Sequence, residues 1–481
     1  MSFTFVKKGI LGRKLDMNFK KKFIGDKHFY KMLMVIALPI IIQNGITNFV
    51  SLVDNIMIGV IGTEQMTGVS VVNQLMWVYN LSIFGLISGA GIFGAQFYGK
   101  GDEEGMRYTF RFKFVLSVVF SILAIIAFYI WGDGLISLFL HEGGETGDLE
   151  KALYYGKQYL LIMLITLLPN AITQSYASTL RERGQTVVPM VAGVVAVLIN
   201  VCLNGVLIFG LFGFPALGVA GAAIATCIAK VAEMLVVIMW THKHSEEHPF
   251  IKGAYKRIYV PRYLVVQILI KGTPLMFNEV MWSVGITFLM QCYSTRGLAV
   301  VAALNISNTL VNLFNVVFIS IGLAITIIIG QLLGAGKLEE ARDTDNKLIF
   351  TTISSCVVLG GIVMLIAPLF PQIYNTTDEV KTLATSFLRV SALFMPVAAF
   401  LNASYFTIRT GGRTFITFLF DSVFVWAITV PVAFVLTRYT SVDIIAIYFA
   451  CQAVDILKCT IGFFLLRSGI WLNNIVDNDG K

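Results

Sequence analysis

The chain has 481 residues, of which 57% are hydrophobic and only 13% are charged. A soluble protein carries about 25% charged residues, so this composition excludes a soluble globular fold and indicates an all-α integral membrane protein. The formal net charge of +8 does not indicate a nucleic-acid partner, because many of the bases precede the first apolar run. Bases in that place are typical of a cytoplasmic flank that contacts anionic membrane lipid.

Hydropathy and turn signals predict twelve transmembrane helices along the chain. The expected spans are 30–60, 66–97, 109–131, 153–179, 186–210, 217–241, 264–293, 299–332, 347–370, 382–407, 414–436 and 443–466. Bases gather in alternate connections, as Lys100, Arg107, Arg111 and Lys113 do, whereas "GDGLISLFLHEGGETGDLE" contains neither Lys nor Arg. The positive-inside rule therefore predicts a multi-pass protein of the cell (inner) membrane with both termini in the cytoplasm.

The second half of the chain repeats the first. In that alignment Pro39 corresponds to Pro274, and Lys230 corresponds to Lys458. Each half holds an even number of spans, so the halves are expected to be parallel repeats, as in transporters that bind substrate between two bundles. The predicted parts are a basic cytoplasmic tail (1–29), an N-lobe (30–241), a cytoplasmic linker (242–263), a C-lobe (264–466) and a cytoplasmic tail (467–481).

Asp54 interrupts the first apolar run with a carboxylate that has no cation within a helical turn. In the fifth span, Asn200 and Asn204 are spaced i,i+4 and lie on one helix face. At 1.5 Å per residue, Asp54 lies about 12 Å, Asn204 about 9 Å and Asn200 about 15 Å below the outer ends of their helices. We therefore predict one cation-coupling site for Na⁺ or H⁺ at these three residues. The alternative is that the asparagines only join helices.

Glu279 lies near the middle of the seventh span, and its repeat mate is Asn44. Polar groups at mid-membrane usually face a cavity, so both residues are expected to line the substrate cavity. Pro39 and Pro274 interrupt the first and seventh spans at equivalent points. Because proline removes a backbone hydrogen bond, both are predicted hinges.

The other charges deep in the spans fall on three helices. Lys230 and Glu233, and likewise Asp455 and Lys458, are spaced i,i+3, which favours an ion pair within each helix. Asp421 lies two turns inside the eleventh span, and its role is left open.

No cofactor is expected. The tract "HKHSEEH" lies in the linker and favours a solvated segment over a metal site. "GQLLGAGKL" lacks the spacing of a phosphate-binding loop, so transport is expected to depend on an ion gradient.

Several segments resemble the multidrug and toxic compound extrusion (MATE) transporters of bacteria. They are "ALPIIIQNGITNFVSLVDNIMIGVIGT", "SGAGIFGAQFYGKGD", "TLRERGQTVVPMVAGVVAVLINVCLNGVLIFGLFGFPALGVAGAAIAT" and the repeated "TIRTGGRT". The resemblance implies two six-helix lobes in a V and export of amphiphilic organic cations in exchange for Na⁺ or H⁺. The family's acidic and amide positions match Asp54, Asn200, Asn204 and Glu279. An aspartate often found in helix 10 is replaced near Ala398, which argues against a cation site in the second lobe.

The main hypothesis is thus an antiporter for small amphiphilic molecules, working as a monomer in contact with lipid. A flippase for lipid-linked glycan precursors on a related fold is the alternative, but it should show deep unpaired bases for a pyrophosphate. An enzyme embedded in the membrane would need a metal motif or a nucleophile with its base, and the sequence shows neither pattern.

Overall fold

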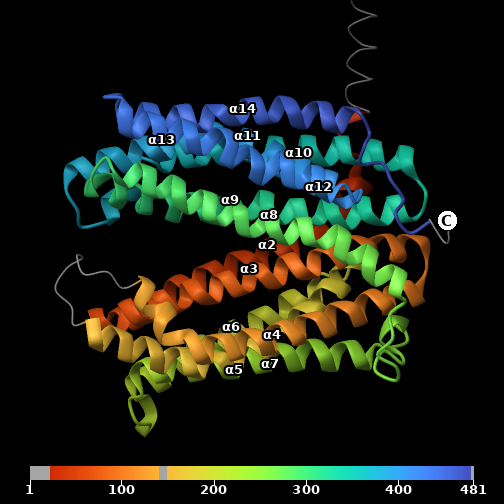
Figure 1. Ribbon diagram of the computed structural model, residues 1–481, viewed down its shortest axis with the longest axis horizontal. Helices are drawn as coiled ribbons and strands as arrows, with labels where there is room; N and C mark the ends of the chain where they lie inside the picture. The colour runs from red at the N-terminus through yellow and green to blue at the C-terminus, as the bar shows by residue number, and fades with distance from the viewer. Residues whose placement is uncertain (1–21, 140–148, 478–481) are drawn as a thin grey trace, which may run out of the picture. The chain divides into compact units, whose positions relative to one another are not determined.

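The computed structural model describes residues 22–139 and 149–477, and these residues form helices joined by short turns (Figure 1). Most of the expected basic tail, and the middle of the acidic connection after the third span, lie outside the described residues. The long helices are α2 (Lys27–Gly59), α3 (Thr63–Lys100), α4 (Glu103–Phe139), α5 (Leu149–Glu182), α6 (Val187–Phe209), α7 (Gly218–Lys243), α8 (Arg262–Ser294), α9 (Leu298–Gly334), α10 (Leu338–Ile366), α11 (Asp378–Thr410) and α14 (Ile444–Arg467).

The remaining span is not a uniform α-helix. It consists of α12 (Thr414–Phe418), two π-helical turns, η4 (Leu419–Val423) and η5 (Val425–Thr429), and α13 (Val430–Tyr439). With this span included, the described chain has twelve helical segments that are long and apolar enough to cross a membrane. The prediction of an all-α protein with twelve spans is confirmed.

The helix boundaries follow the internal repeat. α8 begins at Arg262, the repeat mate of Lys27 at the start of α2, and α9 begins at the repeat mate of the first residue of α3. Equivalent turns also share a backbone conformation: Gly101 and its repeat mate Gly336 have φ values of 79° and 74°. Residues with a Cβ rarely adopt that left-handed conformation, so glycine ends the same helix in both repeats.

The chain groups into two compact units. Among the described residues, unit 1 contains 22–41 and 281–477, and unit 2 contains 42–139 and 149–280. The chain therefore passes from one unit to the other inside α2 and inside α8, and the lobe boundaries expected from the sequence stay a prediction. The passage at residues 41 and 42 lies just after Pro39.

Each unit is built around one central helix. In unit 2, α5 packs against α3, α4 and α7, and in unit 1 its repeat mate α11 packs against α9, α10 and α14 (Figure 1).

Glycines permit the closest approach of backbones within unit 2. A Cβ added at Gly89 of α3 would lie 2.3 Å from the Cα of Gly272 in α8. This contact holds the first part of α8, which leads to Glu279, directly against α3.

A buried ion pair lies inside unit 2 where the sequence indicated only loop bases. Lys113 of α4 is 1% exposed, and its Nζ lies 2.8 Å from both carboxylate oxygens of Glu182, at the end of α5. Ser178 donates a further hydrogen bond to Glu182 over 2.7 Å. Lys113 lies inside the expected span 109–131 but was grouped with the bases of a cytoplasmic connection; that grouping is wrong, because α4 carries this side chain into the bundle.

We expect Lys113→Met to lower the free energy of unfolding by about 3–5 kcal/mol, since it leaves the Glu182 carboxylate buried without its ammonium partner. The double variant Lys113→Met, Glu182→Met should recover most of that loss. Thermal unfolding of the purified protein followed by fluorescence measures both effects. Lys157→Met is the matched control, because its pair with Asp133 is exposed and contributes about 0–1 kcal/mol. Equal melting temperatures for Lys113→Met and Lys157→Met would contradict the assignment.

Candidate functional site

The structure brings Asp54, Asn200 and Asn204 together inside unit 2. Asn204 of α6 is 1% exposed, and its Nδ2 donates a hydrogen bond to Asp54 Oδ1 of α2 over 2.6 Å. The same Nδ2 lies 3.2 Å from Asn200 Oδ1, one turn earlier on α6. The proximity that depth and helix face predicted is therefore present, while the coupling role of the three residues stays a prediction.

The second asparagine links this network to α7. Asn200 Nδ2 lies 3.1 Å from Thr226 Oγ1, whose hydroxyl donates to the carbonyl of Ala222 over 3.0 Å. With its amide turned over, Asn200 presents the nitrogen to Asp54 Oδ1 at 3.0 Å and accepts from Thr226 instead. Because either orientation finds partners, Asn200 is able to offer Asp54 a donor or offer an incoming cation an oxygen.

The network also contains an oxygen suited to a cation. Asn204 Oδ1 is buried and accepts no hydrogen bond from any residue within the described part of the chain. A buried carbonyl oxygen without a donor is costly, and amide and carboxylate oxygens are the ligands that Na⁺ prefers. Tyr159 of α5, which is 5% exposed, interacts electrostatically with Asp54 and adds a hydroxyl to the same region. The group therefore fits either a proton on Asp54 or a monovalent cation among the oxygens.

The residues predicted for the substrate cavity lie in the same unit. Asn44 on α2 and Glu279 on α8 are both half-buried, and each has an interacting partner in the structure. The neighbouring turns of α2 contain Gln43, whose side-chain oxygen accepts a hydrogen bond from Arg181 over 3.0 Å. Pro39 and Pro274 lie inside continuous helices, so neither one ends a helix, and their role as hinges stays a prediction.

The other intramembrane charges divide into one confirmed pair and one corrected pair. Lys230 and Glu233 form the predicted i,i+3 ion pair over 2.9 Å. Lys458 does not pair with Asp455 and instead contacts Asp421, with Nζ 2.7 Å from Oδ1. The sequence spacing suited a pair along α14, but helix packing brings Asp421 of η4 into contact with the ammonium group of Lys458 in place of Asp455 on the preceding turn of α14.

One buried carboxyl was missed altogether. Asp345 of α10 is 3% exposed and accepts a hydrogen bond from Thr407 Oγ1 of α11 over 2.6 Å. It follows the acidic start of α10, so hydropathy placed it outside the span. Its repeat mate Phe110, which is fully buried, was the one available signal that this position faces inward.

Comparison with known proteins gives concordant matches over nearly the whole chain. The MatE family profile matches residues 39–206 and 274–435. The probable multidrug resistance protein YoeA of Bacillus subtilis is 25% identical over 443 residues, which cover 89% of this chain and 92% of that protein. The probable multidrug resistance protein NorM of Thermotoga maritima is 24% identical, with 92% of this chain and 93% of that protein covered.

Solved structures agree on the fold. The Vibrio cholerae MATE transporter VcmN matches with a TM-score of 0.82 at 16% identity, over 92% of this chain and 97% of that one. An outward-facing multidrug resistance MATE family transporter matches with a TM-score of 0.83 at 20% identity, over 93% of this chain and 96% of that one. Likeness at these identities concerns the fold alone.

Twelve membrane-spanning helices in a duplicated fold, with a carboxylate network inside one helical unit, define a multi-pass membrane transporter and not an enzyme. The two segments that match the family profile lie in the two repeats, one in each. The chain belongs to the MatE family, which confirms the resemblance drawn from its sequence.

The linker forms a second organised region, on the end of unit 2 where α4 begins. Arg111 of α4 donates to the carbonyl oxygens of Ala254 (2.7 Å) and Gly253 (2.8 Å), and Arg107 donates to that of Pro249 (3.1 Å). Phe250 is fully buried. Residues 249–254 are therefore packed onto the bundle, because these carbonyl contacts hold their backbone. In the tract that was expected to be solvated, residues 242–247 are exposed or partly exposed, and only His248 is buried.

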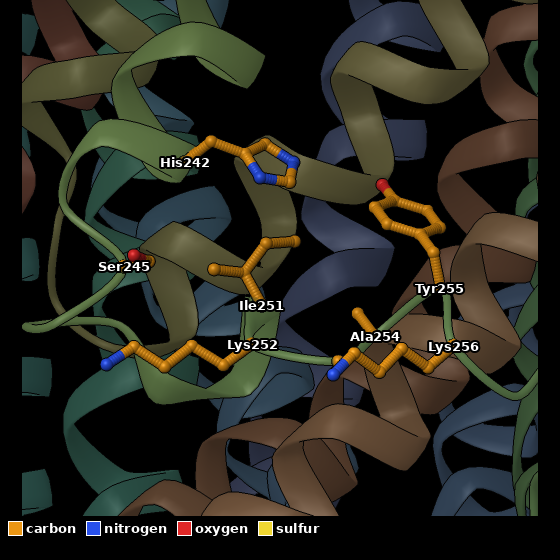
Figure 2. Close-up of a pocket in the computed structure, with 8 residues that line it drawn as sticks. His242, Ser245, Ile251, Lys252, Ala254, Tyr255 and Lys256 are labelled. Atoms are coloured by element: carbon orange, nitrogen blue, oxygen red, sulfur yellow. The ribbon is translucent and has the colours of Figure 1, made fainter.

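The three histidines of the linker tract have separate surroundings. His242 lies 3.1 Å from the hydroxyl of Tyr176 and stacks on Tyr255, beside a cavity of about 300 Å³ (Figure 2). His244 stacks on Trp240 with ring centroids 4.2 Å apart. His248 is 3% exposed, and neither of its ring nitrogens has a hydrogen-bond partner among residues 22–139 and 149–477. Burial, and then the nearby Arg183 guanidinium, hold the pKa of His248 below its usual 6.5.

Because the pKa of His248 is lowered in the folded state, we expect the docked linker to become less protected at acidic pH. A histidine whose pKa is lower in the folded state stabilises that state above its unfolded pKa, and the contribution is lost as the pH falls below about 6.5. We expect hydrogen-exchange protection of residues 247–254 to fall between about pH 7 and pH 5. His248→Phe should remove the decrease, whereas His28→Phe, at an exposed position in unit 1, should retain it. An unchanged decrease in His248→Phe would show that another group is responsible.

Proposed function

We propose that the protein is a secondary antiporter that exports amphiphilic, often cationic compounds in exchange for H⁺ or Na⁺. The observation that supports this most directly is the hydrogen bond of 2.6 Å between Asn204 and Asp54 inside a membrane-spanning unit. A carboxylate placed there is costly unless it changes its charge or its cation during function. The relatives named as probable multidrug resistance proteins support the export of drugs.

Each step of the coupling follows from the chemistry of the network. When Asp54 is ionised, the amide nitrogens of Asn204 and Asn200 neutralise part of its charge. When a proton or Na⁺ binds, the net negative charge of the network is removed. The amide oxygens of the asparagines then accept a hydrogen bond from the protonated carboxyl or contact the Na⁺. The free energy available is modest: about 1.4 kcal/mol for each tenfold ion gradient and about 2.3 kcal/mol per charge for 100 mV. One ion per cycle supports roughly a tenfold to several-hundredfold concentration of substrate.

The substrate and the setting complete the proposal. We assign Glu279 and Asn44 to substrate binding, because a half-buried anion at mid-membrane suits a lipophilic cation that has lost part of its hydration. The protein acts as a monomer in the cell (inner) membrane with both termini in the cytoplasm, and it needs no cofactor beyond the coupling ion. The orientation rests on the bases of the first repeat. Arg107, Arg111 and Arg183 gather at one end of unit 2, where Arg183 pairs with Glu103 over 2.6 Å.

We expect Asp54→Asn to bind a fluorescent cationic dye normally but to lose gradient-driven efflux, by at least about tenfold, because the amide keeps the shape and cannot change charge. The measurement uses purified protein in lipid vesicles, with a pH step or a Na⁺ step applied one at a time. Asp133→Asn is the matched control, since Asp133 is exposed at the surface of the same unit.

Adding Asn204→Ala to Asp54→Asn should hardly increase the efflux defect, because groups that act as one site are not additive. Normal efflux by Asp54→Asn would mean that the aspartate only packs helices. Defects that multiply in the double variant would mean that Asn204 acts elsewhere.

A separate prediction concerns the class of substrate. Glu279→Gln should weaken binding of cationic dyes about tenfold while leaving neutral dyes of similar size nearly unchanged, since one charge–charge contact near the surface of a cavity is worth on the order of 1–2 kcal/mol. Dye binding measured by fluorescence polarisation separates the two classes. Asn44→Ala serves as a comparison at the repeat-related position. An equal loss for both kinds of dye would remove Glu279 from substrate recognition.

A further inference from the structure

Three charged side chains meet inside unit 1, in the second repeat. Lys458 of α14 is 5% exposed, and its Nζ lies 2.7 Å from Asp421 Oδ1 of η4. Asp455 lies one helical turn before Lys458 on α14 and interacts electrostatically with both members of that pair. The group is thus a cluster of two carboxylates and one ammonium.

The cluster lies deep in the membrane-spanning segments. Asp455 lies at the middle of α14, which runs from Ile444 to Arg467. At 1.5 Å per residue, about 16–18 Å of helix separates it from either end. Asp421 lies about 10 Å from the start of its own span, so Asp455 is the deeper of the two carboxyls.

The charges of the cluster do not cancel when all three groups are ionised. Lys458 neutralises Asp421, and its ammonium also lies 5.2 Å from the ring centre of Phe420, a contact that adds to the stabilisation of the cation. Asp455 is then left with a full negative charge, and within the described part of the chain no residue donates a hydrogen bond to it. The other titratable groups that interact with it are the thiols of Cys451 and Cys459, which supply no positive charge.

An uncompensated anion at mid-membrane costs at least about 2.5–3.5 kcal/mol, so a positive species is expected to accompany Asp455. A metal ion is a poor candidate, because the Lys458 ammonium would repel it and the described residues contain no cluster of three His, Cys, Asp or Glu ligands. A proton needs no ligand set. It removes the excess charge by binding directly to the carboxylate.

We propose that Asp455 is a second, exchangeable proton-binding site of this protein, with Asp421 and Lys458 as its positioning residues. In the structure Lys458 contacts Asp421. When Asp455 loses its proton, the i,i+3 spacing on α14 lets the same ammonium turn toward Asp455, as the sequence pattern alone had indicated. One lysine thus shares its charge between two carboxylates, and one proton is taken up or released.

Two further features set this cluster apart from a packing pair. Asp421 lies in the first of two successive π-helical turns, a distortion that is rare overall and often found at functional sites. The repeat also supplies an internal comparison. Lys230, the mate of Lys458, pairs with Glu233 on its own helix, while the positions equivalent to Asp421 and Asp455 are Gly193 and Cys227. The fold therefore does not require either extra carboxyl.

The test reads the proton itself and does not depend on transport. Infrared difference spectra of purified protein in lipid nanodiscs report the carbonyl stretch of protonated carboxyls during a pH titration. The difference between the natural protein and Asp455→Asn should contain one such band, which disappears as the pH is raised. Lys458→Met should change the pH at which the band disappears, whereas Lys230→Met, the matched variant in the first repeat, should leave that pH unchanged.

Identical carboxyl bands in the natural protein and Asp455→Asn at every pH would overturn the proposal. If Asp455→Asn does not fold, Asp455→Glu decides the matter, since it should move the same band without removing it. Asp54→Asn should leave the Asp455 band in place. The infrared result is therefore distinguishable from a failure of the proposed transport function, which the vesicle assay of Asp54→Asn measures separately.

Discussion

The constraint on which this structure depends is the lack of water in the hydrocarbon part of a membrane. Every backbone group there must be paired within the protein, which is why the described chain consists of long helices. The same constraint applies more severely to charge. Each ionised side chain within a span must find a counter-charge, a set of hydrogen bonds or a bound ion. Lys113 and Glu182 meet this requirement as a closed pair, while Asp54 meets it by accepting a hydrogen bond from the amide of Asn204.

Because the chain contains an internal repeat, the placement of buried charges can be compared between two equivalent halves of one molecule. Helix starts and left-handed glycines coincide between the repeats, so the two units solve the packing problem in the same way. Their polar interiors nevertheless differ. Unit 2 carries the network of Asp54 and the asparagines, and unit 1 carries the cluster around Lys458. The duplicated backbone does not require these charges, because the two repeats carry different polar residues on the same helix plan, and our proposals therefore concern these side chains.

The family assignment and the site rest on different kinds of observation. Matches to the MatE profile and to solved structures concern the path of the chain and the arrangement of its helices. At 16% to 25% identity they do not transfer the role of a single side chain. The chemistry therefore depends on contacts in this molecule, such as the unpartnered oxygen of Asn204 among the residues described. The linker adds a third element, since His248 is buried where it docks at one end of unit 2 and neither of its ring nitrogens has a hydrogen-bond partner among the described residues.

The sequence by itself determined the features that depend on neighbouring residues or on regular helix geometry. Apolar runs predicted the twelve spans, and the internal repeat predicted two equivalent halves. Depth and the i,i+4 spacing predicted that Asn200 and Asn204 lie at the level of Asp54. Only the tertiary structure decided the contacts between distant segments. It buried Lys113 against Glu182, placed Lys458 against Asp421 and not Asp455, and docked the linker on α4. The physical reason is that the partner of a charged side chain is the nearest opposite charge in space. Between helices, that distance depends on packing, which hydropathy and spacing do not encode.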